Sequence, residues 1–391
     1  MILFQLIFWA SLAVLVYSYL GYGGLVWIFT RNRPPQRSGE HDAEWPAVSL
    51  IIAAYNEADV LDQKIRNSLA IDYPVHRLKI LLVTDGSTDD SASLAQRYPS
   101  IQLIHQPQRQ GKYAAICHAM QQVETPIVVF TDANTLLNPE CLKRMLPHYQ
   151  DPAVGGVAGE KKIRMDANHS AVGQAEGLYW HYESFMKKMD ARFYTTVGAA
   201  GELFSIRTAL FKADQRAWII DDFIIAMQIC MQGYRMAYEP GAFATEAPSV
   251  SLAEEQKRKI RIAAGAYQAA TYLRKALSFN KYPRLAFQYF SRRLLRWFAC
   301  PLALLLLLLS NGVLLYLSPD NSFYQWIMFL QGLYYLLSLA GWLLLRTGKK
   351  AGILSIPYYF LFMNVCLIRG FLLYKQGKQT ALWEKAARQA N

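Results

Sequence analysis

The sequence lacks the cysteine spacings that mark a zinc site or a disulfide framework. Its five cysteines are scattered singly along 391 residues, at Cys117, Cys141, Cys230, Cys300 and Cys366. Cysteines placed in this way are typical of reduced, buried side chains rather than of metal ligands. The sequence also lacks internal repeats and low-complexity segments, and its length suits one large or two ordinary domains.

Charged residues are absent from the start of the chain. Residues 2–29 contain none, and this apolar run is long enough to cross a hydrocarbon layer of about 30 Å. It lacks the basic start and short apolar core of a cleavable signal peptide, so residues 1–30 are predicted to form a retained transmembrane helix. Three further apolar runs follow near the other end, at residues 298–317, 323–345 and 352–374, and the last carries Asn364 and Arg369.

Basic residues next to these runs predict how the chain is oriented in the membrane. Arg31, Arg33 and Arg37 follow the first run and place residues 31–297 in the cytoplasm. Basic residues also follow the third run and fill the tail, residues 375–391, and both cannot be cytoplasmic if the fourth run crosses fully. We therefore predict three spans and an interfacial or re-entrant fourth run, with a full span as the alternative. An integral protein of a bacterial inner membrane is expected.

Acidic residues are missing from a region next to the predicted spans. Between Gln256 and Trp297 the sequence has eleven basic residues and no acidic one. This charge suits anionic lipid headgroups or a phosphorylated substrate, whereas nucleic acid is a poor candidate because the region adjoins the membrane. Residues 265–297 are accordingly predicted to form basic amphipathic helices at the membrane interface.

The rest of the chain alternates between strand and helix signals. Apolar runs at residues 48–54, 78–83, 101–105 and 127–130 predict strands of a parallel sheet with right-handed crossovers. Ligands of such sheets bind beyond the carboxyl ends of the strands. Asp132 and Asn134 lie at such an end, and side chains two residues apart share one face of an extended segment. They are candidate ligands of one divalent cation, and an Asx turn is the alternative interpretation.

Six motifs in this region resemble, in their order along the chain, those of family 2 glycosyltransferases with the GT-A fold. They are Ala54-Tyr55-Asn56-Glu57, residues 84–89, Gly111-Lys112, residues 131–134, residues 198–204, and Asp221-Asp222-Phe223 followed by residues 233–235. With its flanking apolar runs the chain is similar to the polysaccharide-synthase branch, which includes cellulose, hyaluronan, chitooligosaccharide and poly-N-acetylglucosamine synthases. The resemblance implies a Rossmann-like α/β domain with a mostly parallel sheet at residues 31–264, and transmembrane helices at residues 1–30 and 298–374.

The resemblance also implies a UDP-sugar donor and a divalent cation, Mg²⁺ or Mn²⁺. The residues implied to contact the nucleotide sugar are Ala54, Tyr55, Glu57, Asp85, Lys112, Asp132, Arg258 and Arg261. Asp132 and Asn134 would hold the cation, and the acceptor would lie at Gly201 and Glu202. A UDP leaving group needs such surroundings because its developing negative charge must be met by a metal ion and cations.

Asp222 is implied to be the general base that removes the proton of the acceptor hydroxyl, and Asp221 is the rival candidate. Both residues are also typical of the first turn of a helix, where the helix dipole stabilises acidic side chains. Attack from the face opposite the leaving group inverts the anomeric configuration. The predicted function is therefore transfer of a hexose or N-acetylhexosamine from a UDP-sugar to a growing β-linked polysaccharide.

Two residues typical of these synthases are lacking. Asn134 stands where the family often has Asp, and residues 256–261 lack the tryptophan on which a growing chain would stack. Two alternative functions stay open: single transfer to a lipid or lipid-diphosphate acceptor, and an inactive, membrane-tethered nucleotide-binding scaffold. Export of a polymer through so few helices would require an oligomer or a partner membrane protein.

Overall fold

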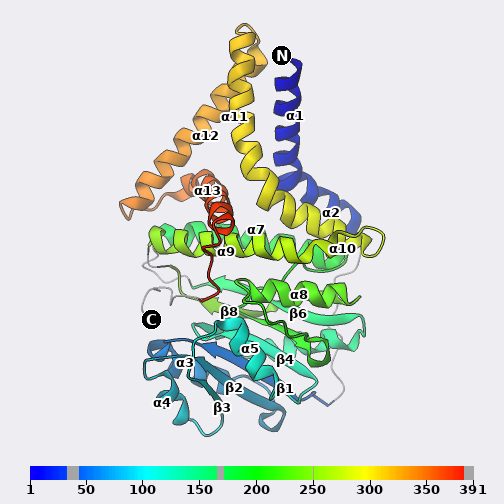
Figure 1. The fold of residues 1–391 in the computed structure, drawn as a ribbon, viewed down its shortest axis with the longest axis vertical. Helices are drawn as coiled ribbons and strands as arrows, with labels where there is room; N and C mark the ends of the chain where they lie inside the picture. The colour runs from blue at the N-terminus through cyan, green and yellow to red at the C-terminus, as the bar shows by residue number, and fades with distance from the viewer. Residues whose placement is uncertain (33–43, 165–170, 250, 383–391) are drawn as a thin grey trace.

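The computed structural model describes residues 1–32, 44–164, 171–249 and 251–382. Arg33, Arg37 and residues 383–391 of the predicted tail lie outside these ranges. Figure 1 shows three layers: upright helices at one end, a middle layer formed by α7 (Ala171–Phe193) and α9 (Leu252–Tyr272), and a β-sheet with its covering helices at the other end.

The sheet contains eight strands in the order β3-β2-β1-β4-β7-β6-β8-β5. They are β1 (Val48–Ala54), β2 (Leu78–Asp85), β3 (Gln102–Gln106), β4 (Ile127–Asp132), β5 (Thr135–Leu137), β6 (Val154–Ile163), β7 (Phe204–Arg207) and β8 (Arg235–Glu246). Strands β1 to β4 are mutually parallel, as predicted, and β6 is parallel to β8. Strand β7 runs antiparallel to β4 and β6, and β5 runs antiparallel to β8. The sheet is therefore mixed, with parallel pairs in the majority.

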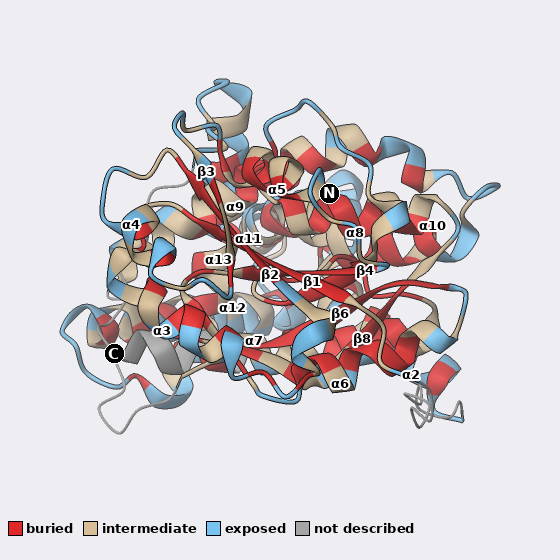
Figure 2. Ribbon diagram, turned by 90° about the horizontal axis from the view of Figure 1, so that it is seen from below, coloured by how far each residue is buried: buried red, intermediate tan, exposed pale blue. Residues whose placement is uncertain are grey.

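The central strands are buried on both faces (Figure 2), which explains why they appear as continuous apolar runs in the sequence. One face packs against α3 (Ala58–Leu69), α4 (Ser91–Gln96) and α6 (Cys141–Met145). The other face packs against α5 (Lys112–Met120), α8 (Asp221–Met231) and the end of α9. Because helices cover both faces of the sheet, a ligand can reach it only at the edge formed by the strand ends.

Strand β6 was not predicted, because its sequence begins Val154-Gly155-Gly156 and glycine is unfavourable in strands. The structure shows why glycine is needed there. A Cβ atom added to Gly156 would lie 2.5 Å from Sδ of Met236 on the neighbouring β8. Because β6 and β8 approach each other closely, this position requires glycine. Strand β6 therefore lacks the apolar run by which the other strands can be recognised in the sequence.

Four stretches of the described residues are long and apolar enough to cross a membrane. The first, Ile2–Thr30, comprises α1 (Ile2–Val16) and α2 (Tyr22–Thr30), and the second, Pro283–Leu317, comprises α10 (Pro283–Tyr289), the π-helical segment η6 (Phe290–Ala299) and α11 (Cys300–Leu317). The third is α12 (Ser322–Arg346), and the fourth, Gly352–Lys375, contains α13 (Ser355–Lys375). They correspond to the four apolar runs of the sequence.

Helix α13 packs closely along α9. Toward its start, the Tyr359 hydroxyl donates a hydrogen bond to Glu255 of α9 at 3.1 Å. Toward its end, a Cβ atom added to Gly370 would lie 2.4 Å from Cβ of Ala263. Helix α13 therefore follows the middle layer over much of its length, which favours the interfacial placement over a full span. The domain boundary predicted at residue 264 falls inside α9.

Arg292 joins the membrane helices to the middle layer through a buried ion pair. Its guanidinium contacts Glu183 at 2.7 Å and Asp190 at 3.2 Å, and both acids belong to α7. Arg296 adds a contact to Glu183 at 2.8 Å, and the Tyr22 hydroxyl of α2 donates to Asp190 at 2.5 Å. Part of the basic region that was predicted to face lipid headgroups thus points inward, because two buried carboxylates attract it.

We expect Arg292→Met to destabilise the protein by about 3–5 kcal/mol, because it leaves two buried carboxylates without this cation. The thermal unfolding midpoint of the detergent-purified protein should fall accordingly. Arg284→Met is the matched control, since Arg284 is exposed on the adjoining α10. Equal midpoints for the two variants would contradict the anchoring role of Arg292.

Candidate active site

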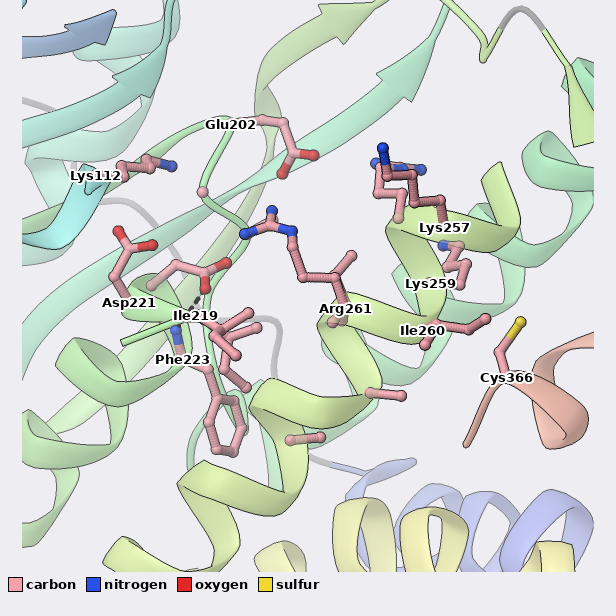
Figure 3. A pocket seen from close by; sticks show the side chains of 18 of the residues that line it. Lys112, Glu202, Ile219, Asp221, Phe223, Lys257, Lys259, Ile260, Arg261 and Cys366 are labelled. Atoms are coloured by element: carbon pink, nitrogen blue, oxygen red, sulfur yellow. Dashed lines mark hydrogen bonds between the residues drawn. The ribbon is translucent and has the colours of Figure 1, made fainter. Parts of the chain in front are cut away.

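A cleft of about 690 Å³ lies at the carboxyl ends of β1 and β4 and extends to the middle layer of helices. Figure 3 shows side chains from the sheet edge, α8 and α9 converging on it. The predicted site residues that line it are Glu57, Lys112, Asp132, Asn134, Gly201, Glu202, Asp221, Asp222, Arg258 and Arg261. Residues far apart in the sequence thus meet where the strand order predicts a ligand.

Asp132, the last residue of β4, places its carboxylate in the cleft. It forms an ion pair with Lys112, the first residue of α5. Burial raises the pKa of the Asp132 carboxyl, and the neighbouring Lys112 ammonium acts in the opposite direction. Asn134 lines the same cleft and donates a hydrogen bond from Nδ2 to Oε1 of Glu246 at 3.3 Å.

This donor set suits a divalent cation that takes most of its ligands from elsewhere. Asp132 and Asn134 offer hard oxygen atoms from one short loop. No group of three or more His, Cys, Asp or Glu side chains among the described residues is arranged to hold a metal ion. A cation bound by few protein ligands and by substrate phosphates fits such a loop.

A buried lysine that the sequence did not reveal stabilises the loop that carries Asp132 and Asn134. Lys64 of α3 is fully buried, and its Nζ donates to Oγ1 of Thr131 and to the carbonyl of Thr135, both at 2.8 Å. Burial lowers the pKa of Lys64 to about 7, against the opposing effect of the Asp132 carboxylate. The available signal was its position on the apolar face of α3, next to Ile65.

The two candidate bases lie in the first turn of α8 and both line the cleft. Oδ1 of Asp222 accepts a hydrogen bond from the backbone N–H of Phe223 at 2.8 Å. Burial and the like charge of Asp221 raise the pKa of Asp222 to about 7, although Lys112 opposes this. Oδ2 of Asp221 is buried and has no hydrogen-bond partner among the described residues. Asp221 and Asp222 therefore lie at the N-terminus of α8, as helix-dipole stabilisation requires, and they also face the cleft.

Gly201 lies where three charged side chains meet. A Cβ atom added to it would lie 3.0 Å from Nζ of Lys112, 3.6 Å from Oδ2 of Asp222 and 3.8 Å from Oδ2 of Asp132. These groups come from α5, α8 and β4 respectively. A cation, a candidate metal ligand and a candidate base are thus within a few ångströms of one point, which is the geometry that group transfer needs.

Glu202 is held by a second buried lysine that the sequence did not reveal. Nζ of Lys161 contacts Oε1 of Glu202 at 2.5 Å and also forms an ion pair with Glu246. Burial acts to raise the pKa of Glu202, but the Lys161 ammonium outweighs it and lowers the pKa well below the usual range. Glu202 is therefore a fixed negative charge beside the candidate base.

The two predicted arginines differ in their surroundings. Arg258 is engaged by Glu255, with Nε to Oε2 at 3.1 Å, and approaches Glu246 at 4.0 Å. Arg261 points toward the acidic residues in Figure 3, and burial lowers its pKa while Asp221 acts to raise it. Arg261 is thus the better placed of the two to meet a negatively charged leaving group.

Three residues predicted to contact the nucleoside do not line the cleft. Ala54 is buried at the end of β1, and the Tyr55 ring packs under the Arg109 guanidinium at 3.8 Å. Asp85 accepts hydrogen bonds from the backbone N–H groups of Gln110 and Gly111, at 2.7 and 2.8 Å. Asp85 therefore stabilises the turn before Lys112. Its predicted contact with the nucleobase of the donor stays a prediction.

Tryptophans from elements outside residues 256–261 line the cleft. The expected stacking residue is missing at residues 256–261, but Trp180 of α7, Trp218 before α8 and Trp297 of η6 all contribute to the wall. Trp297 packs its ring against Phe223 at 5.3 Å between centroids. The aromatic segment at residues 179–182 could be considered from the sequence as either a sugar-site lining or a packing surface, whereas Trp218 was missed because its position depends on how the helices pack.

The fold and the site define a class. The chain has the GT-A glycosyltransferase fold, in which helices cover a mixed sheet and a cleft lies at the carboxyl ends of parallel strands, here with long apolar helices attached. The family model described as "Glycosyltransferase like family 2" matches residues 46–265. The chain belongs to that family.

Similar curated proteins are named poly-β-1,6-N-acetyl-D-glucosamine synthases. One from Staphylococcus aureus is 25% identical over 263 residues, which span 63% of this chain and 61% of that protein. One from Staphylococcus epidermidis is 22% identical over 261 residues, with the same coverage. The match therefore spans about three fifths of these relatives' length.

A solved structure shares the whole architecture. It is the mannosyltransferase PcManGT from Pyrobaculum calidifontis, in complex with GDP-Man and Mn²⁺. The two chains superpose with a TM-score of 0.74 at 22% identity, covering 96% of this chain and 99% of the other. This likeness confirms the fold, including the helices outside the sheet domain.

We expect Gly201→Ala to lower kcat/KM for the donor roughly tenfold or more, because its Cβ would displace Lys112 from Asp132. Release of the nucleoside diphosphate measures the effect. Gly24→Ala is the control, since nothing lies within 4 Å of a Cβ added at Gly24. Normal turnover by the Gly201 variant would show that this point is not part of the reacting site.

Proposed function

We propose that the protein is a membrane-bound inverting glycosyltransferase. It transfers a hexose or N-acetylhexosamine from a UDP-sugar to an acceptor hydroxyl and makes a β-linked glycan. The observation that supports this best is the convergence of Lys112, Asp132 and Asp222 around Gly201. The names of the similar synthases point to N-acetylglucosamine as the first sugar to test.

In the proposed reaction Asp222 accepts the proton of the acceptor hydroxyl while that oxygen attacks the anomeric carbon. Lys112 and Arg261 face the diphosphate and meet the charge that develops as UDP leaves. Mg²⁺ or Mn²⁺, held by Asp132 and Asn134, would neutralise further charge on the diphosphate. Attack from the side of Asp222, opposite the leaving group, inverts the configuration.

The alternative from another class is a membrane-tethered scaffold that binds a nucleotide without turnover. Asn134 in place of an acid would support it. The surroundings of Asp222 favour the enzyme instead, because burial and the carboxylate of Asp221 raise its pKa to about 7. A general base works best at such a value, whereas a scaffold has no use for it.

The test is nucleoside diphosphate release by the purified full-length chain with Mn²⁺ or Mg²⁺. The donors would be UDP-N-acetylglucosamine, UDP-glucose, UDP-galactose and GDP-mannose. We expect metal-dependent release with one UDP-sugar and its loss in Asp222→Asn, while UDP binding by calorimetry persists. Release with GDP-mannose alone would overturn the choice of UDP. Binding without release from any donor would favour the scaffold.

The activity should depend on pH through Asp222. A base must be deprotonated, so kcat/KM should fall about tenfold per unit below pH 7 and level off above it. Asp221→Asn removes the like charge that raises this pKa, and the falling limb should move to lower pH. An inactive Asp221→Asn beside an active Asp222→Asn would reverse the two roles.

A further inference from the structure

The cleft has a second end, which lies away from the sheet and against the membrane helices. Its wall there includes Met363, Cys366 and Leu367 of α13 together with the exposed Arg369. Figure 3 shows Cys366 on the side of the cleft opposite Lys112 and Asp221. An occupant of this end meets apolar side chains and cationic groups at once, which differs from the acidic surroundings of Asp222.

Lys187 of α7 lines the cleft and is only 5% exposed, yet its ammonium has no hydrogen-bond partner among the described residues. Burial lowers its pKa, and the carboxylates of Glu160, Glu202 and Glu183 act to raise it. Leaving a buried ammonium without a hydrogen bond costs several kcal/mol in general. Such a group in a cleft wall indicates that a ligand completes its coordination.

The acids near Lys187 are already engaged by other groups. Glu160 accepts hydrogen bonds from Ser184 at 2.6 Å and from Tyr238. Glu183 is held by Arg292 and Arg296, and Glu202 by Lys161. Each of these carboxylates is therefore already paired with another group. The ammonium of Lys187 is the cation that a ligand can contact here.

Trp180 gathers further positive charge at the same place. The ammonium groups of Lys161, Lys187 and Lys259 lie 4.9, 5.6 and 5.8 Å from its ring centroid. Lys161 and Lys259 also contact carboxylates, of Glu202 and Glu255 respectively. Three ammonium groups thus surround one indole at the junction of β6, α7 and α9, and Lys187 is the one of the three whose ammonium has no hydrogen-bond partner among the described residues.

We propose that this end of the cleft binds the phosphate of a lipid-linked acceptor, in which a sugar is joined to a membrane lipid through phosphate. The phosphate lies at Lys187 with Arg369 at the rim, and the lipid chain lies against Met363 and Leu367 of α13. A neutral glycan would supply no anion for Lys187 and would place its hydroxyls against these apolar side chains. This inference rests on the proposed transferase function and specifies its acceptor.

The charge of Glu202 affects both the candidate base and Lys187. Its carboxylate acts to raise the pKa of Asp222 and that of Lys187. In the reaction the O–H bond of the acceptor sugar breaks and its proton goes to Asp222. The oxygen forms the new bond to the anomeric carbon, and UDP leaves with the electron pair of the broken C–O bond.

The test compares acceptors that differ in one feature, with the donor identified by UDP release. The main probe is N-acetylglucosamine on a C55 polyprenyl diphosphate in phosphatidylcholine vesicles. The same sugar on a C16 alkyl chain lacks phosphate, soluble N-acetylglucosamine 1-phosphate lacks lipid, and a β-linked N-acetylglucosamine trimer lacks both. We expect kcat/KM for the polyprenyl diphosphate probe to exceed that for each of the others at least tenfold.

Variants of α7 then locate the phosphate. Lys187→Met should raise the KM for the polyprenyl diphosphate probe roughly tenfold or more, and more than the KM for the donor, because a charge-assisted hydrogen bond is lost. Lys187→Arg keeps the charge and should restore much of the affinity. Lys188→Met is the matched control, since Lys188 is the next residue of the helix and is exposed.

Several outcomes would overturn the inference while leaving the transferase function intact. Equal use of the alkyl glycoside or the trimer would exclude the phosphate, and equal use of the soluble sugar phosphate would exclude the lipid. An unchanged acceptor KM in Lys187→Met would exclude this site. By contrast, absence of UDP release from every donor would refute the proposed function itself.

Discussion

The buried pairing of Arg292 with Glu183 and Asp190 is the contact on which the rest of the molecule depends. It fixes the segment that enters the membrane against α7, and α7 in turn packs against the sheet domain, α2 and α13. The cleft takes one wall from the sheet and the other from helices that adjoin the membrane. The site is therefore complete only when the sheet domain and the helices that carry Arg292 are docked.

Within the cleft, burial decides which charges have a chemical use. Most of the charged groups there neutralise one another, as Lys161 does with Glu202 and Arg292 with Glu183. The exceptions include Asp222, whose pKa is raised to about 7, its neighbour Asp221, whose Oδ2 is buried without a hydrogen-bond partner among the described residues, and Lys187, whose ammonium also has none there. Because desolvated charges are costly, these groups are the ones to which we assign proton transfer and ligand binding.

The parallel half of the sheet and most of the candidate site could be predicted because both depend on short, local sequence patterns. Strands β1 to β4 are apolar runs that end in polar turns, and Asp132, Lys112 and Asp222 sit in short motifs. Lys64 and Lys161 were missed because a buried lysine is tolerated only through partners far along the chain, such as Glu202 for Lys161. Strands β5, β6 and β7 were missed because short length, in β5 and β7, and glycine, in β6, replace the apolar pattern.

The basic region between Gln256 and Trp297 shows a related limit. Its composition predicted a surface that faces headgroups, but Arg292 is almost completely buried. The opposing acids lie on α7, about a hundred residues earlier, so nothing within the region itself indicates which arginines turn inward. The net charge of a segment predicts the sign of the charge on its partner. It does not predict whether that partner is a lipid, a substrate or another helix.

The contacts at the two ends of α13 bear on the conflict between the basic residues that flank it. Before the helix, Ala351 belongs to an apolar cluster with Leu252 and Ile260 of α9. After it, a Cβ atom added to Gly111 would lie 3.3 Å from the Ala381 carbonyl, and residues 380–382 line the same cleft as Asp222. Both ends thus lie on the side of the sheet domain, whereas a helix that crosses a bilayer separates its ends by about 30 Å of hydrocarbon. These contacts favour the predicted interfacial or re-entrant placement, which would leave the basic residues of both flanks on one side of the membrane while α13 lines the cleft.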